Sequence, residues 1–363
     1  MILAGCAALA GALFASCSYL RKGGDAAGRP GERSSPNFRD GKYLNPVPTI
    51  VTGDGTVLDT IWRWISSTEQ RTPPVRMEFP NPSLRESLDA EDGLRVAWVG
   101  HSSVIIKIDG KIFLTDPMWS ERASPVSFMG PARFFNPPFP LEALPPLDGV
   151  IISHDHYDHL DRDTVTRLAA TGVVFYTPLA VGEILRSWGI PGERVVELDW
   201  HEERALGGGH SLIAAPARHF SGRGIGKRDT TQWASWIITS GKHRVYFGGD
   251  GGYFAGFADI GARYGPFDLV MLEIGAYGDN WPDIHMGPSN AVKAHLDLKG
   301  AVLLPIHWGT FNLAFHSWTE PVEKLIAAAD TQGIRLCLPR PGLVVGGDLT
   351  VNSRWWKADR KSP

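Results

Sequence analysis

The chain has 363 residues, and its 36 lysines and arginines against 39 aspartates and glutamates give a net charge of −3. Because positive and negative charges nearly balance, the chain is not a strongly basic protein of the kind that binds nucleic acids or other polyanions. A chain of about 300 residues or more buries most of its apolar surface on folding, so it can be stable without disulfides. Only Cys337 lies beyond the first 20 residues, which excludes an internal disulfide once those residues are removed.

The first 20 residues are almost wholly small and apolar, which predicts a secretory leader, although the usual basic start is missing. Cys6 and Cys17 each follow small residues, as in the cleavage box of bacterial lipoproteins. The residues before Cys6 match the cleavage box better, but too few residues precede them to form a signal. Enough residues for a signal precede Cys17, but those next to it match the box less well. An uncleaved anchor is the alternative, and the run is short for a span of about 20 residues. We therefore expect a membrane-tethered protein of the bacterial cell envelope, at the outer membrane or on the periplasmic face.

Residues 21–92 separate this leader from the first predicted strands. Residues 21–50 are rich in Gly, Pro, Arg and Ser, the composition of a flexible tether that holds a domain off a membrane. Residues 55–92 predict an N-terminal extension that wraps the domain. Trp62 and Trp64 in this extension are interpreted as packing anchors rather than as a binding site.

The main domain is expected over residues 93–350, with a polar tail over 351–363. Three strands are predicted at its start, over residues 96–99, 103–108 and 111–115. Asp109-Gly110 joins the last two, and this dipeptide is a strong signal for a two-residue hairpin. His101 lies in the turn between the first two strands.

Residues 118–146 form a long connection that carries seven prolines and, among its apolar side chains, Phe128, Met129, Phe134, Phe135 and Phe139. A connection of this length in a compact domain is usually functional. One hypothesis is an apolar lip that admits an acyl chain or enters a membrane surface. The other is that the aromatic rings fold back onto the core, and the sequence does not decide between them.

The chemistry of the chain is concentrated in residues 153–159, Ser-His-Asp-His-Tyr-Asp-His, directly after the apolar run 149–152. Imidazoles and carboxylates at the end of a buried strand are costly to desolvate unless something pairs with them. His154 and His156 point to the same side of an extended segment, while Asp158 and His159 follow where the chain turns. This ligand set suits zinc, with manganese and ferrous iron as neighbours in preference. The stretch therefore predicts a metal site, which two adjacent ions can share.

Further ligands must come from other strand ends. His219, Asp250 and His307 each follow an apolar, strand-like segment, and strand ends are where open sheets place their chemistry. The segments between them alternate in type, which predicts a layered α/β architecture. Strands are expected over 173–176, 233–239, 244–247, 269–274 and 301–306. Helices are expected over 162–170, 179–188, 288–299 and 320–332, the last ended by Gly333.

The ligand pattern and the sequence motifs around it resemble those of the metallo-β-lactamase superfamily. These motifs include Trp98-Val99-Gly100-His101-Ser102-Ser103, Phe113-Leu114-Thr115-Asp116-Pro117, Glu197-Leu198-Asp199-Trp200 and Ile306-His307-Trp308-Gly309-Thr310-Phe311. Over roughly residues 75–345 the chain is similar to the branch that contains N-acyl-phosphatidylethanolamine-hydrolysing phospholipase D and its bacterial relatives. The resemblance implies an αββα four-layer sandwich, with the metals along one edge between the sheets.

The resemblance also assigns roles by matching position. His154, His156 and His219 would bind one zinc ion. Asp158, His159 and His307 would bind the other, and Asp250 would bridge the two. Hydrolysis would use a hydroxide shared by the ions, with no side-chain nucleophile.

Three further residues receive interpretations. His285 is expected either to act as a catalytic residue beside Asp158, by steadying the phosphoryl group or protonating the leaving oxygen, or to orient a metal ligand. Asp116 is expected to be a buried carboxylate that holds a metal-binding histidine. His101 is expected near the metals without binding them, or else as a hydrogen-bonded turn histidine.

The function implied is a zinc-dependent phosphodiesterase that acts on N-acyl-phosphatidylethanolamine or related phospholipids, at a membrane surface. Residues 277–282 depart from the pattern of the animal enzyme, so the head group is inferred from the branch alone. One alternative is a lactone or ester hydrolase of the same fold. The other is a metal-binding envelope protein without catalysis, against which the complete ligand set argues.

Overall fold

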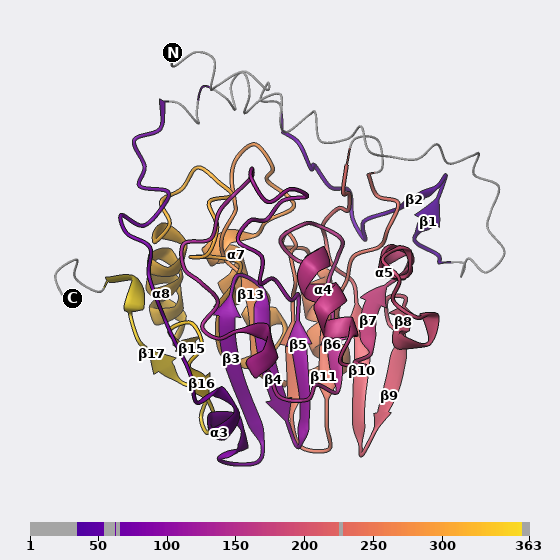
Figure 1. Cartoon of the computed structure of the whole chain (residues 1–363). Helices are drawn as coiled ribbons and strands as arrows, with labels where there is room; N and C mark the ends of the chain where they lie inside the picture. The colour runs from indigo at the N-terminus through magenta and orange to yellow at the C-terminus, as the bar shows by residue number, and fades with distance from the viewer. Residues whose placement is uncertain (1–34, 54–61, 63–65, 225–227, 358–363) are drawn as a thin grey trace.

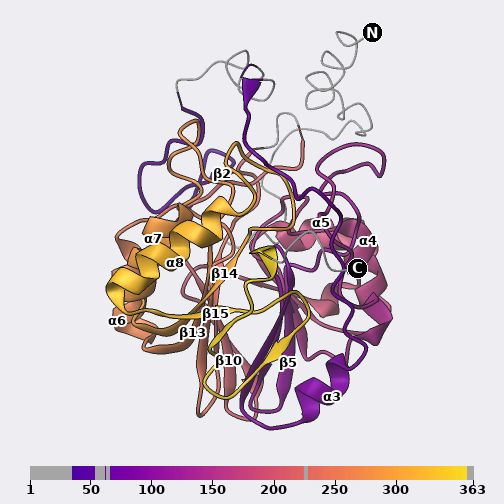
Figure 2. The same ribbon diagram turned by 90° about the vertical axis from the view of Figure 1, so that its left-hand side faces the viewer.

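Two β-sheets packed face to face, with helices on both outer faces, form the domain (Figure 1). The structure is a computed structural model, and it describes residues 35–53, 62, 66–224 and 228–357. In Figure 2 the helices α6 (Gly256–Tyr264), α7 (Gly287–Asp297) and α8 (Glu320–Gln332) lie on one side of the sheets. The helices α4 (Arg162–Ala169) and α5 (Val181–Ser187) lie on the other. The predicted αββα four-layer sandwich is confirmed.

The first sheet has seven strands in the order β16-β3-β4-β5-β6-β7-β8. Their bounds are β3 Leu94–Gly100, β4 Ser103–Ile108, β5 Lys111–Thr115, β6 Gly149–Ile151, β7 Phe175–Pro178, β8 Val195–Leu198 and β16 Val344–Val345. The β4–β5 turn is the predicted two-residue hairpin, in which Asp109 and Gly110 both have positive φ, at 44° and 92°. From β5 to β8 the strands are parallel. The long connection 118–146 returns the chain from β5 to β6, and the helices α4 and α5 return it from β6 to β7 and from β7 to β8.

The second sheet has eight strands in the order β17-β15-β14-β13-β12-β11-β10-β9. Their bounds are β9 Glu203–Gly207, β10 His210–Ala215, β11 Ser235–Thr239, β12 Arg244–Phe247, β13 Phe267–Glu273, β14 Gly300–Ile306, β15 Arg335–Leu338 and β17 Val351–Asn352. The pairing is antiparallel from β9 to β12 and parallel from β12 to β17. Strands β10, β12 and β14 therefore all end at the same edge of the sheet.

Tryptophans join the two sheets through the shared core. The rings of Trp98 in β3 and Trp308 after β14 stack with centroids 5.5 Å apart and planes 8° apart. Trp236 in β11 donates its indole N–H to the carbonyl of Ile152 across a distance of 3.0 Å. That carbonyl directly precedes the predicted metal-binding stretch, so the second sheet helps to set where the stretch begins.

Both ends of the domain differ from the prediction. The expected polar tail is wrong for residues 351–357, because β17 extends the second sheet and Trp355 and Trp356 are buried. The expected free tether is wrong for residues 35–50. There β1 (Phe38–Arg39) and β2 (Lys42–Tyr43) form a hairpin, and Tyr43 is buried. Residues 1–34, with both candidate lipidation sites, lie outside the described residues, and so does Trp64.

The extension between residue 66 and β3 runs along the domain and ends in the short helix α3 (Leu84–Asp89), which buries Leu84 and Leu88. Met77 forms a bridge with Phe135 of the long connection. Trp62 is 69% exposed, so its interpretation as a packing anchor is wrong.

The long connection 118–146 mostly folds back onto the core. Phe134, Phe135 and Phe139 are buried, while Phe128 is 76% exposed. The hypothesis of an apolar lip is therefore wrong for these three rings. Among the described residues, no helix combines the length and the apolar character needed to cross a bilayer.

The Trp236 hydrogen bond can be tested by replacing the indole with a ring that cannot donate. Trp236→Phe leaves the buried carbonyl of Ile152 without this donor, which costs about 1–3 kcal/mol in free energy of unfolding. Urea unfolding measures the loss, with exposed Trp62→Phe as the matched control, expected within about 0.5 kcal/mol of the parent. Equal midpoints for the two variants would contradict the assigned role.

Candidate metal centre

All seven predicted metal ligands lie at one edge of the sandwich, at the upper end of the strands in Figure 1. His154, His156, Asp158 and His159 follow β6, and the other three follow strands of the second sheet. His219 comes after β10, Asp250 after β12 and His307 after β14. The two-sheet topology brings these strand ends together, although residues 154 and 307 are far apart in the chain.

The first group consists of three imidazoles. His154 Nε2 lies 2.8 Å from His156 Nδ1, and His219 Nε2 lies 3.3 Å from the same atom. The donor atoms of all three lie within 4.8 Å of one another. Three nitrogens that converge in this way form the side of a tetrahedral metal site and leave a position open.

The second group contains His101, Asp158, His159 and His307, whose donor atoms also lie within 4.8 Å of one another. Asp158 Oδ2 lies 2.9 Å from His101 Nε2, 3.4 Å from His307 Nε2 and 3.5 Å from His159 Nε2. His101 is buried against this group, in the left-handed conformation with φ of 54°. His101 therefore lies at the centre, as expected, and its hydrogen bond is to Asp158, which is 57 residues along the chain. Its donor atom lies among the possible metal ligands, so the expectation that it does not bind a metal stays a prediction.

Asp250 lies between the two groups. Its Oδ2 atom is 2.9 Å from His307 Nε2 and 3.1 Å from His159 Nε2 in the second group. The same oxygen is 4.0 Å from the Nε2 atoms of both His154 and His219 in the first group. A carboxylate in this position can contact two ions at once.

Several of these buried atoms lack a hydrogen-bond partner among the described residues. They are His159 Nε2, His307 Nε2 and Asp250 Oδ1. Buried polar atoms normally have a partner. The unsatisfied atoms, together with a set made only of imidazole and carboxylate, fit divalent cations such as zinc, manganese or iron.

Hydrogen bonds behind the cluster determine which nitrogen of each ring faces it. The buried Asp116 accepts from Ser153 N at 2.7 Å, Ser153 Oγ at 2.6 Å and His159 Nδ1 at 2.7 Å. Because the hydroxyl of Ser153 donates to Asp116, its oxygen can accept from His154 Nδ1 at 2.9 Å. His154 and His159 therefore both direct Nε2, rather than Nδ1, toward the cluster. Asp116 is buried and bonded to His159, as predicted, while metal binding by His159 stays a prediction.

His219 is oriented by a backbone carbonyl. Its Nδ1 lies 3.0 Å from the oxygen of Ile284. A carbonyl oxygen only accepts, so Nδ1 carries the proton and Nε2 keeps its lone pair for the cluster.

The electrostatics agree with a site made for cations. Burial, together with the neighbouring imidazoles, lowers the pKa of His154 and His219 well below the ordinary value, so these rings are neutral. Burial also opposes charge on His307, but Asp250 and Asp158 outweigh burial and raise the pKa of His307 to about 10. The carboxylates thus attract positive charge, which a bound metal would supply in place of a proton.

Glu273 is a member of the site that the sequence analysis missed. It ends β13, is fully buried, and accepts from His285 Nδ1 at 2.6 Å and from Gly251 N at 2.8 Å. Asp250, Glu273, His285 and His307 have donor atoms within 4.8 Å of one another. The available signal was a single carboxylate in the otherwise apolar run 269–274, where burial is costly unless the group is bonded. Burial also raises its pKa.

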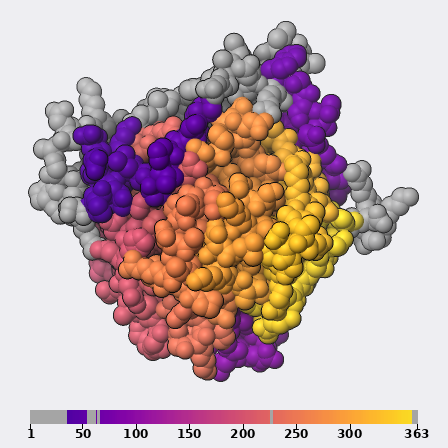
Figure 3. All heavy atoms as spheres, turned by 180° about the vertical axis from the view of Figure 1, so that it is seen from behind, coloured from indigo at the N-terminus to yellow at the C-terminus, as the bar shows by residue number. Residues whose placement is uncertain are grey.

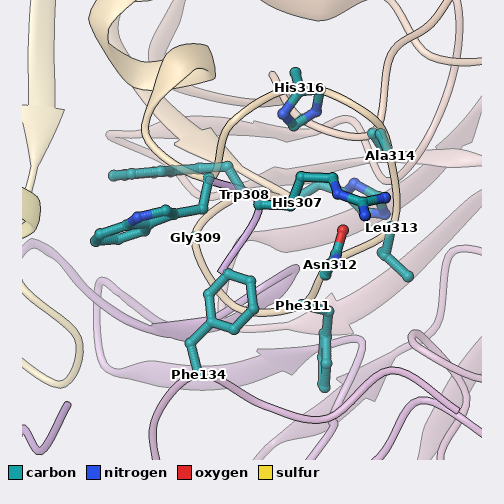
Figure 4. Close-up of a pocket in the computed structure, with 13 residues that line it drawn as sticks. Phe134, His307, Trp308, Gly309, Phe311, Asn312, Leu313, Ala314 and His316 are labelled. Carbon is teal, nitrogen blue, oxygen red and sulfur yellow. The ribbon is translucent and has the colours of Figure 1, made fainter. Parts of the chain in front are cut away.

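A small recess opens beside His307. Its walls are largely aromatic, and it is lined by Arg71, Phe134, Gly275, Ala276, His307, Trp308, Gly309, Phe311, Asn312, Leu313, Ala314, His316 and Trp318. In Figure 4 His316 and Phe134 lie on opposite sides, with His307 and Asn312 between them. At its base, the backbone of Gly275 is so close to the carbonyl of His307 that an added Cβ would lie 2.1 Å from the oxygen.

A four-layer αββα sandwich with this cluster at its open edge defines a metal-dependent hydrolase. The family model described as the beta-lactamase superfamily domain matches residues 111–308. The chain therefore belongs to the metallo-β-lactamase superfamily.

Two relatives show where in the superfamily the chain lies. It is 46% identical over 344 residues to an uncharacterized protein of Mycobacterium tuberculosis, covering 92% of this chain and 91% of that protein. It is 36% identical over 259 residues to N-acyl-phosphatidylethanolamine-hydrolyzing phospholipase D 1 of Caenorhabditis elegans, covering 68% of this chain and 73% of that enzyme. The predicted resemblance to this branch is confirmed.

Solved structures share the fold at lower identity. Igni18, a metallo hydrolase of Ignicoccus hospitalis, is 24% identical with a TM-score of 0.54, covering 69% of this chain and 97% of its own. An isothiocyanate hydrolase from Delia radicum gut bacteria is 20% identical with a TM-score of 0.55, covering 70% and 98%. These likenesses establish the sandwich and leave the substrate open.

The role of Asp116 gives a prediction about metal affinity. Asp116→Asn keeps the shape of the side chain but puts an amide where three donors point, so His154 and His159 lose their orientation. We expect metal affinity to fall by about 10–100-fold in competition with a chromophoric chelator. Asp163→Asn, on the solvent face of α4, is the matched control and should bind as the parent does. An unchanged affinity in Asp116→Asn would show that the imidazoles are held by other contacts.

Proposed function

We propose that the protein is a phospholipase of the D type, which hydrolyses N-acyl-phosphatidylethanolamine or a related phospholipid to phosphatidic acid and an N-acylethanolamine. The observation that carries the proposal is the 36% identity over 259 residues to the nematode enzyme of that name. The metal centre supports it, because convergent imidazoles and carboxylates with open positions suit a phosphate ester.

We further propose that two zinc ions are held here, one by His154, His156 and His219 and the other by Asp158, His159 and His307, with Asp250 between them. When bound, such a pair lowers the pKa of a shared water toward about 7 and neutralises the phosphate oxygens. Manganese and iron remain to be tested, since one solved structure of this fold, CmlA of Streptomyces venezuelae, is a diiron β-hydroxylase with a TM-score of 0.52.

His285 is the residue proposed to handle the proton. Its Nδ1 is bonded to the buried Glu273, so Nε2 is the nitrogen free to face the leaving oxygen. The side chain is 13% exposed, which leaves it reachable from the open edge. Water adds its oxygen to phosphorus, the bond from phosphorus to the ethanolamide oxygen breaks, and that oxygen takes a proton from His285 Nε2. The water keeps one proton as the new P–OH group, and its other proton returns to His285. Glu273 holds the ring in this orientation through Nδ1.

The activity is tested with the purified full-length chain in detergent and N-acyl-phosphatidylethanolamine, with mass spectrometry of both products. Zinc, manganese and ferrous iron are supplied separately to the chelator-treated protein. We expect phosphatidic acid and N-acylethanolamine with at least one metal, and no turnover by Asp158→Asn. Hydrolysis of a lactone or a simple diester, with no phospholipid turnover, would replace the substrate class by the esterase alternative. Metal binding with no turnover of any substrate would favour the non-catalytic envelope protein.

His285 gives a separate kinetic prediction. His285→Gln should lower kcat by about 10²–10⁴-fold, because a positioned proton donor contributes about that much. Its metal content should stay at the parent level, and exposed His201→Gln should leave both quantities unchanged. Loss of metal from His285→Gln would instead assign His285 to the orientation of a ligand.

The proposed location is the bacterial cell envelope, with residues 1–20 as the attachment. Fractionation of cells that express the parent, Cys6→Ala and Cys17→Ala tests it. We expect one of the two substitutions to release the protein from the membrane fraction, and retention of both would favour an uncleaved anchor.

A further inference from the structure

The segment of residues 45–53, which we name the N-terminal strap, lies against the metal centre. Figure 3 shows this indigo part of the chain on the surface of much later residues. Its first residue, Asn45, makes two hydrogen bonds to the backbone of His219. Asn45 Nδ2 donates to the His219 carbonyl at 2.7 Å, and His219 N donates to Asn45 Oδ1 at 2.9 Å. One side chain thus pairs both backbone polar groups of a residue 174 positions away.

The rest of the strap is bonded to the two loops that carry His219 and His285. Arg218 Nη2 donates to the carbonyl of Pro48 at 2.8 Å, and Arg218 Nε donates to Thr49 Oγ1 at 3.1 Å. The backbone N–H of Ile50 donates to Asp283 Oδ2 at 2.8 Å. Arg218 and Asp283 also form an ion pair of 2.6 Å, with both side chains mostly buried.

His219 needs such support because no strand or helix holds it. It lies between β10, which ends at Ala215, and β11, which begins at Ser235. Its ring is held by Ile284 and its backbone by Asn45. Among the three imidazoles of the first group, His219 is the one that comes from outside residues 154–159. Its position relative to His154 and His156 therefore depends on contacts of this kind.

We propose that Asn45 is a positioning residue of the metal centre, which acts through His219 on the cation held by His154, His156 and His219. The N-terminal strap is then a functional part of the site rather than a spacer. The second group, which includes His101, Asp158 and His307, receives no bond from Asn45. Loss of Asn45 therefore weakens one of the two cation positions and spares the other. This inference rests on the proposed two-ion assignment and does not depend on the substrate.

The test measures zinc affinity of the full-length chain by competition with a chromophoric chelator, in the parent and in Asn45→Ala. We expect one class of bound zinc to weaken by about 10–100-fold, with the other class unchanged. Asn37→Ala, directly before β1 and outside the N-terminal strap, is the matched control and should match the parent. Equal affinities in Asn45→Ala and the parent would overturn the proposal, and so would an equal loss at both positions.

A double-mutant cycle separates this role from a general effect on folding. Because Asn45 acts through His219, adding Asn45→Ala to His219→Ala should cause no further loss of zinc affinity. A further loss of the same size would overturn the proposal. If Asn45→Ala fails to fold, Asn45→Asp serves in its place. It keeps the acceptor for His219 N but loses the donor to the His219 carbonyl, so the same class of zinc should weaken, and unchanged binding would again overturn the proposal.

Discussion

The buried carboxylate of Asp116 is the group on which the metal centre depends. It follows β5 and receives three hydrogen bonds from the chain that follows β6, two from Ser153 and one from His159. Burial raises the pKa of Asp116, and these donors offset that cost. Through Ser153 the same carboxylate also determines the tautomer of His154. A single acid at the end of one strand thus sets two ligands at the end of the next.

The cluster also links metal binding to the stability of the sandwich. Strand ends from both sheets meet at one edge and bring imidazoles and carboxylates into a region without enough hydrogen-bond partners. Packing of the core drives these groups together, and a cation compensates for the water that they lose. Stability is therefore expected to depend on metal, even though no ligand lies in the hydrophobic core.

Much of the fold could be predicted because local signals agreed with tertiary structure. Asp109-Gly110 required a tight hairpin, and Gly333, in the left-handed conformation with φ of 65°, ends α8 as expected. The ligand pattern after the run 149–152 was dense enough to indicate a metal site, and the structure brings those residues together. The role of Asp116 could be predicted because the motif around it, residues 113–117, matched the family pattern.

The remaining features depend on contacts that leave no local trace. Glu273 lies in an apolar run, and only its burial beside His285 shows that it belongs to the site. Asn45 lies in a segment with the composition of a linker, and its function depends on a partner 174 residues away. The last residues looked polar and free, yet Trp355 and Trp356 complete the core. The composition of a segment indicates which side chains it can bury, but contacts with residues far along the chain determine which of them are buried.

The close approach of Gly275 to His307 bears on how this enzyme can diversify. Any side chain at position 275 would collide with the backbone of His307, a candidate metal ligand, so this position is closed to variation while the site is retained. Asn312 and Leu313 line the same recess, lie in a loop, and have half-buried side chains. Natural drift or directed evolution toward new substrates is therefore expected to change residues of the loop after β14. Gly275, which follows β13, is expected to stay unchanged.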